Sequence, residues 1–325
     1  MHEIVKMVLL AMIKGIYDSF KGMLVVFYLD KEVNERARNR QNSSAIRQKQ
    51  VEESSQRPPK KHEKSKVVHN VIQCALLNGG VFLLSVLLFE YVLLPTIDSI
   101  FNIMFGAESF VTGVVWLWVK YFILLIYRTA WLIPLFLLSK IINALWFQDI
   151  ADSAYRYSRG KPTSFPSISM YFADSIFSIV VQCLFLIQTT CISYLPFYPV
   201  GYALYYAQMS LLYSLYSFEY KWFNMGWELH KRLSFIEENW PYFIGFGLPL
   251  TILTQISESF VINGCVFSIL FPLFIISGNE ANPVILSNNF GCNTKIFSFV
   301  IIVANVIFSR TIGQTKKVPL TSGSR

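Results

Sequence analysis

The chain has 325 residues, of which 54% are hydrophobic, 16% aromatic and only 15% charged. With a mean hydropathy of +0.44, this composition argues against two soluble domains and is typical of a multipass membrane protein. The net charge of +8 is concentrated in residues 31–66, which hold eleven Lys or Arg and five Asp or Glu. This basic run lacks interleaved aromatic residues, so we expect contact with lipid or an acidic partner and no nucleic-acid binding.

The sequence predicts an all-α membrane bundle with about six transmembrane or partly penetrating helices and amphipathic helices at the interface. In residues 1–29, the charged side chains fall within an arc of ~120° on a helix, and the remaining arc is apolar; they are Glu3, Lys6, Lys14, Asp18 and Lys21. This pattern predicts an interfacial helix, with packing against protein as the alternative. Residues 30–66 are polar and contain Pro58 and Pro59, so we expect a disordered cytosolic linker.

Apolar blocks divide a predicted transmembrane domain, 67–309, into spans; these are 71–94, 114–138, 168–195, 200–218, 242–256 and 260–277. The connections 95–113 and 196–199 lack Lys and Arg, which predicts that both termini, including a basic tail at 310–325, are cytosolic. The last two blocks would be only ~23 and ~27 Å long as helices. They either thin the membrane or form a hairpin that does not fully cross it.

Three charged residues fall within the first two predicted spans, where charges need partners or a wet cavity. In an antiparallel hairpin Glu90 and Lys120 lie at similar depth, so we predict that they pair. Arg128 has no partner that the sequence identifies. An ion path is one interpretation, and packing with snorkelling to the interface is the other.

The segment 209–249 leaves the apolar region and re-enters it, and its middle part is charged. Apolar residues there recur at steps of four and three, which predicts a helix lying flat at the membrane surface. A second motif, WFQDIAD at 146–152, is predicted to lie on the same, cytosolic side of the membrane. Together they predict a cytosolic docking surface, with packing at headgroup level as an equal alternative; its residues are Trp146, Phe147, Asp149, Asp152, Trp222, Phe223, Trp227 and Trp240.

The sequence offers no motif for catalysis. The five cysteines include no CxxC pair, the four histidines lie beside no intramembrane carboxylate, and no GxSxG, HExxH, P-loop or dinucleotide glycine pattern occurs. We therefore expect no enzyme activity, no metal and no cofactor.

Four long strings resemble the etoposide-induced protein 2.4 family. They are NGGVFLLSVLLF at 78–89, IPLFLLSKIINALWFQDIADSAY at 133–155, MSLLYSLYSFEYKWFNMGWELHKRLSFIEENWPYFIGFGLPL at 209–250 and GCVFSILFPLFIISGNEA at 264–281. The resemblance covers about residues 66 to 309, and the broader superfamily is similar to bacterial sulfate permeases of the CysZ type, whose helical hairpins penetrate the membrane only partly.

The resemblance implies a multipass protein of the endoplasmic reticulum (ER) that autophagosomes need in order to mature into degradative autolysosomes. It also implies partners among autophagy proteins, ER contact sites and membrane lipids, and a link to stress-induced cell death. The leading hypothesis is thus a non-enzymatic ER scaffold or regulator of autophagy. The competing hypothesis is an ion or anion permease, based on Lys120, Arg128 and the bacterial relatives.

Overall fold

The computed structural model describes residues 2–28, 31, 35, 39, 67–106, 111–160, 168–194, 196, 199–283 and 295–312. All regular structure in these residues is helical, and they contain no β-strand. The predicted all-α class is therefore confirmed. The predicted linker and the predicted tail lie almost entirely outside the described residues.

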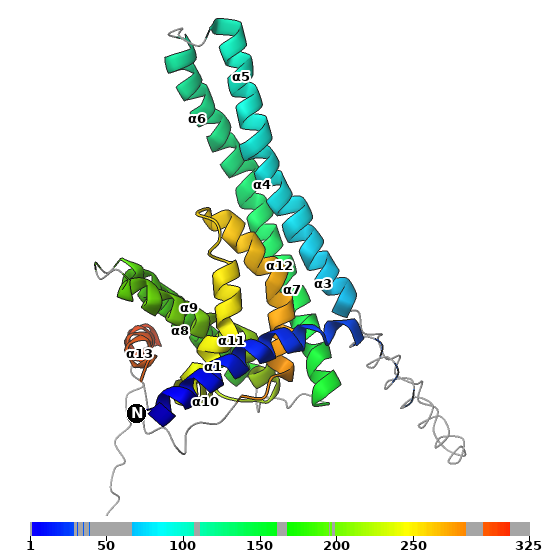
Figure 1. The fold of residues 1–325 in the computed structure, drawn as a ribbon, viewed down its shortest axis with the longest axis vertical. Helices are drawn as coiled ribbons and strands as arrows, with labels where there is room; N and C mark the ends of the chain where they lie inside the picture. The colour runs from blue at the N-terminus through cyan, green and yellow to red at the C-terminus, as the bar shows by residue number, and fades with distance from the viewer. Residues whose placement is uncertain are drawn as a thin grey trace, which may run out of the picture.

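Two long helical stretches, Val67–Phe105 and Gly113–Ser158, form an antiparallel hairpin that extends well beyond the other helices (Figure 1). The elements of the first arm are α3 (Val67–Ala75), the π-helical η1 (Leu76–Leu83), α4 (Leu84–Leu88), the π-helical η2 (Phe89–Leu93) and α5 (Leu94–Phe105). Those of the second are η3 (Val111–Val115), α6 (Trp116–Ile126), η4 (Tyr127–Leu132) and α7 (Ile133–Ser158). At ~1.5 Å per residue, each arm is longer than the ~30 Å hydrocarbon core.

The helix does not end at Pro95, the residue after the predicted first span 71–94. Pro95 lies in the first turn of α5, and the preceding N–H, that of Leu94, donates to the carbonyl of Phe89 across a π turn. Proline is tolerated in a first helical turn because the N–H that it lacks has no obligatory partner there. The first arm therefore continues to Phe105.

The remaining helices pack around the lower part of this hairpin in Figure 1. They are α8 (Ile168–Ser193), α9 (Val200–Asn224), α10 (Leu229–Glu238), α11 (Trp240–Leu253), α12 (Phe260–Glu280) and α13 (Ser298–Ile312). Helix α9 is central, because it contacts α7, α8, α10, α11 and α12. The core between these helices is aromatic, with fully buried Phe218, Phe243, Phe246 and Phe274. We call the end of the bundle at which α10 and the carboxyl end of α12 lie the near side.

Helix α1 (His2–Met23) crosses α11 and α12 at the near side. Its buried face consists of small or short side chains, namely Ala11, Gly15, Asp18, Ser19 and Gly22. The helices touch almost backbone to backbone, because a Cβ on Gly245 would come 2.1 Å from the carbonyl oxygen of Met12. Two hydrogen bonds fix the crossing: Tyr242 Oη donates to Asp18 Oδ2 at 2.9 Å, and Ser277 Oγ donates to the carbonyl of Ser19 at 2.6 Å.

Four helical stretches in the described residues are long and apolar enough to span a membrane; they are Val67–Phe105, Gly113–Ser158, Phe172–Ser193 and Phe260–Glu280. The predicted spans at 200–218 and 242–256 are not among them, since α9 is too polar and α11 has only 14 residues. The predicted count of about six spans is thus not confirmed, whereas a multipass membrane architecture is.

We expect Gly245→Ala to weaken the docking of α1 by about 1–3 kcal/mol, because the added methyl group must push two backbones apart. Thermal unfolding of the purified protein in detergent measures this loss. Gly80→Ala is the matched control, since a Cβ on Gly80 meets nothing within 4 Å. Equal unfolding midpoints for both variants would contradict the close crossing.

Candidate functional site

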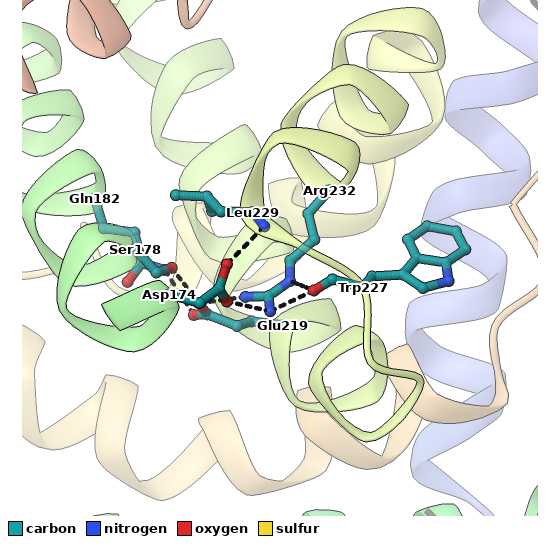
Figure 2. Close-up of polar contacts among 7 residues, drawn as sticks. All are labelled: Asp174, Ser178, Gln182, Glu219, Trp227, Leu229 and Arg232. Carbon is teal, nitrogen blue, oxygen red and sulfur yellow. Dashed lines mark hydrogen bonds and ion pairs between the residues drawn. The ribbon is translucent and has the colours of Figure 1, made fainter. Parts of the chain in front are cut away.

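A fully buried arginine links three helices on the near side of the bundle (Figure 2). Arg232 of α10 forms ion pairs with Asp174 of α8 at 2.6 Å and with Glu219 of α9 at 3.3 Å. The same guanidinium donates to the carbonyl of Trp227 through Nε at 2.8 Å and Nη2 at 2.6 Å. Its donors are therefore directed at oxygens of three different segments, as a buried guanidinium requires.

Further polar groups complete this cluster around the two carboxylates. Ser178 donates a hydrogen bond to Glu219, and Gln182 Nε2 donates to Glu219 Oε2 at 2.6 Å. The backbone N–H of Leu229, at the start of α10, donates to Asp174 Oδ1 at 2.9 Å. We call these residues the Arg232 cluster; they are Asp174, Ser178, Gln182, Glu219, Trp227, Leu229 and Arg232.

The Arg232 cluster fixes α10 rather than exposing a reactive group. The side chain of Arg232 is 0% exposed, and those of Asp174 and Glu219 are 11% and 22% exposed. Asp174 also accepts a backbone N–H at the start of α10, where an anion is favoured by the helix dipole. The arrangement can hold α8, α9 and α10 in one relative position.

A second polar contact on the near side closes the end of α12. Lys221 of α9 is buried and donates to the carbonyls of Gly278 at 3.2 Å and Ala281 at 2.7 Å. These carbonyls lie at the carboxyl end of α12, where helices leave acceptors unpaired and favour a cation. Burial lowers the pKa of Lys221 to about 7.

The two predicted near-side motifs do meet, but largely inside the protein. Asn224 Nδ2 of α9 donates to Asp152 Oδ1 of α7 at 3.1 Å, which joins them. Trp222 and Phe147 are 2% and 8% exposed, so the prediction of a docking surface is wrong for these two residues. They face inward because their apolar side chains extend the aromatic core, and the ring of Trp222 stacks on that of Trp227 at 5.9 Å.

The other predicted docking residues remain partly accessible. Asp149 is exposed, and Asp152 and four aromatic residues are half-buried, namely Trp146, Phe223, Trp227 and Trp240. The indole N–H of Trp240 is buried, and no hydrogen-bond partner for it occurs within the described segments. Whether these residues bind a partner stays a prediction.

The structure does not bring Glu90 and Lys120 together as predicted. Both side chains are exposed, and no ion pair joins them in the described residues. Stacking of Phe89 on Tyr127, with ring centroids 3.5 Å apart, places Glu90 level with Ile126 instead, which is nearer to Arg128 than to Lys120. The register differs because the first arm continues past Pro95, which moves the turn of the hairpin further from Glu90. Arg128 is also exposed.

No role for Arg232 was predicted from the sequence, because the prediction used only the apolar residues of this segment. The helical spacing contained a usable signal: Arg232 lies three residues after Leu229 and four before Ile236, on the apolar stripe. No local pattern, however, connects it with Asp174, 58 residues earlier. Among the described residues, no group of His, Cys, Asp or Glu could hold a metal ion.

Comparisons with known proteins identify relatives. A family model described as sulfate transporter CysZ/etoposide-induced protein 2.4 matches residues 63–258. The chain is 37% identical to Ectopic P granules protein 4 of Caenorhabditis elegans over 151 residues, which cover 46% of this chain and 48% of that protein. It is 31% identical to a protein EI24 homolog of Dictyostelium discoideum over 254 residues, covering 75% of this chain and 76% of that protein. No solved structure matches the chain.

We expect Arg232→Met to destabilise the protein by about 3 kcal/mol or more, because it leaves two largely buried carboxylates without their cation. Unfolding in detergent measures the loss, with the exposed neighbour Lys231→Met as the control. Adding Glu219→Gln and Asp174→Asn to Arg232→Met should restore part of the stability. A single variant as stable as the control would contradict the assigned role of the cluster.

Stability should depend on pH through Lys221, which lies beyond the predicted span 200–218. Because its folded pKa of about 7 is below the ordinary value of ~10.4, the unfolded chain binds more protons between these values, and stability rises with pH. From about pH 7 to about pH 9, we expect wild type to gain about 1–2 kcal/mol relative to Lys221→Met. A difference between the two proteins that is independent of pH would contradict burial of this amine.

Proposed function

The chain belongs to the sulfate transporter CysZ/etoposide-induced protein 2.4 family, and from this membership we propose that it is a non-enzymatic ER scaffold or regulator of autophagy. In this proposal it acts in the ER membrane, with both termini in the cytosol, and autophagosomes need it in order to mature into degradative autolysosomes. Its partners are membrane lipids and proteins of autophagy or of ER contact sites. Catalysis and nucleic-acid binding have no part in it.

The observation that carries the scaffold role is that the polar groups of the Arg232 cluster bond to one another. The guanidinium, which is the most deeply buried charge of the cluster, is bonded to Asp174, Glu219 and the carbonyl of Trp227. Catalytic groups must reach a substrate, whereas these groups are directed at one another. Such a cluster supports a rigid near-side layer on which other proteins can assemble.

Half-buried aromatic residues at the rim of this layer support partner binding. Trp227 and Trp240 pack against the core and retain partial exposure, and Lys231 lies over the Trp227 ring at 4.2 Å. Aromatic side chains of this kind are enriched where proteins dock. Beside them, Asp149 supplies an exposed charge.

The permease hypothesis has no specific observation in its favour. It rests on Lys120, Arg128 and the similarity to bacterial sulfate permeases, and the structure leaves both side chains exposed on the long hairpin. Lys120 lies near the start of its predicted span, where a lysine can extend along its own helix to the headgroups. We therefore do not pursue transport as the main activity.

Rescue of autophagy in cells that lack the protein tests the scaffold proposal. Maturation of autophagosomes, followed with a reporter whose fluorescence changes on acidification, should be restored by wild type and equally by Lys120→Ala with Arg128→Ala. Liposomes that contain the purified protein should show no anion flux above that of empty liposomes. Flux that the double variant abolishes, together with failed rescue by that variant, would contradict the scaffold and favour a permease.

A further inference from the structure

The outward side of α1 is a broad apolar face. Its residues are between 51% and 60% exposed; they are Leu9, Leu10, Ile13, Tyr17 and Phe20. They lie opposite the small residues that pack on α11 and α12. Lys14 and Lys21 lie along one flank of the face, and Lys6 lies within it. An apolar face of this extent, if exposed to water, would favour aggregation.

Lipid is the partner that this face fits. Helix α1 packs directly on α12, one of the stretches long and apolar enough to span the membrane, so it lies beside the same bilayer. A wide apolar surface beside a few lysines is typical of helices that lie in the plane of the interface, where lysine can reach the headgroups. We call the leaflet that holds α1 the near leaflet.

The opposite end of the molecule is much narrower. Of the helices that the structure describes, only the two arms of the long hairpin continue beyond the start of α12 (Figure 1). Gly79 lies against Ile269 of α12, so the two mark a common level. From that level α12 extends about nine residues, or ~14 Å, to its start, whereas the first arm extends about 26 residues, or ~39 Å, to Phe105.

The narrow end is also apolar and must contact lipid. Exposed hydrophobic side chains cover the tip of the hairpin, among them Ile100, Ile103, Met104, Phe105, Leu117 and Trp118. Among the described residues, the outer part of the far leaflet therefore holds only the two arms of the hairpin. The near leaflet holds α1 and the packed bundle in addition to the hairpin.

We propose that this unequal cross-section makes the protein a wedge that partitions to, and stabilises, membrane that is convex on the near-leaflet side. Inserted protein expands the near leaflet more than the far leaflet, and bending toward the far side relieves the difference. The apolar face of α1 contributes to the expansion because it displaces lipid at headgroup level. The inference rests on embedding in the membrane and is independent of any role in autophagy.

Membrane tubes pulled from giant vesicles test the wedge. The purified full chain, carrying a fluorescent label, is reconstituted, and protease accessibility of the near side selects vesicles with that side outward. The protein-to-lipid fluorescence ratio is then compared between the tube and the flat vesicle. We expect enrichment of about two-fold or more in the tube for wild type, because binding of interfacial helices is sensitive to curvature.

Two matched variants assign the effect to α1. Leu9→Ser with Ile13→Ser and Phe20→Ser removes apolar area from exposed positions only, and enrichment should fall toward one. Ile103→Ser with Met104→Ser makes a similar change at the narrow end, where the residues are 84% and 68% exposed, and enrichment should persist. Equal elution and helicity of all three proteins establish that they are folded. A wild-type ratio of one or less, or equal enrichment of both variants, would overturn the proposal.

Discussion

The fully buried guanidinium of Arg232 is the interaction on which the near side of this protein depends. Its ion pairs reach Asp174 and Glu219 on separate helices, so α8, α9 and α10 must keep one relative position. Removing a charge of this kind from water costs several kcal/mol, and only good geometry and further hydrogen bonds offset the cost. Ser178 and Gln182 provide such bonds to Glu219.

Elsewhere on the near side, buried polar groups are also bonded to partners on other helices. Backbone groups at helix ends need partners, and the structure supplies them from neighbouring helices. Lys221 closes α12, and Asn279 of that helix donates to the carbonyl of Ala154 on α7 at 2.8 Å. Asp18 on α1 accepts from Tyr242 on α11. The buried polar contacts thus connect segments that are far apart in the sequence, and they make the near side one unit.

The all-α class and the approximate positions of the helices could be predicted from apolar periodicity and composition, because a chain that spans hydrocarbon has few alternatives to helices. The sequence could not predict the tertiary contacts or the effect of π-helical turns on the register of the hairpin. Pro95 has the features of a span end, yet the helix continues through it after a π turn. Glu90 therefore lies level with Ile126 on the second arm and not with Lys120. Trp222 was predicted to belong to a docking surface, and long-range packing buried it.

The functional proposal follows from family membership and from this near-side unit rather than from a reactive centre. A scaffold needs a surface that keeps its shape. The Arg232 cluster holds helix α10 in place, so α10 should be rigid. Hydrogen exchange of the purified protein in a bilayer nanodisc tests that claim most directly. The account predicts that the backbone amides of Arg232, Leu233 and Ile236 exchange as slowly as those in the middle of α9. Exchange as fast as that of an unanchored surface helix would contradict it.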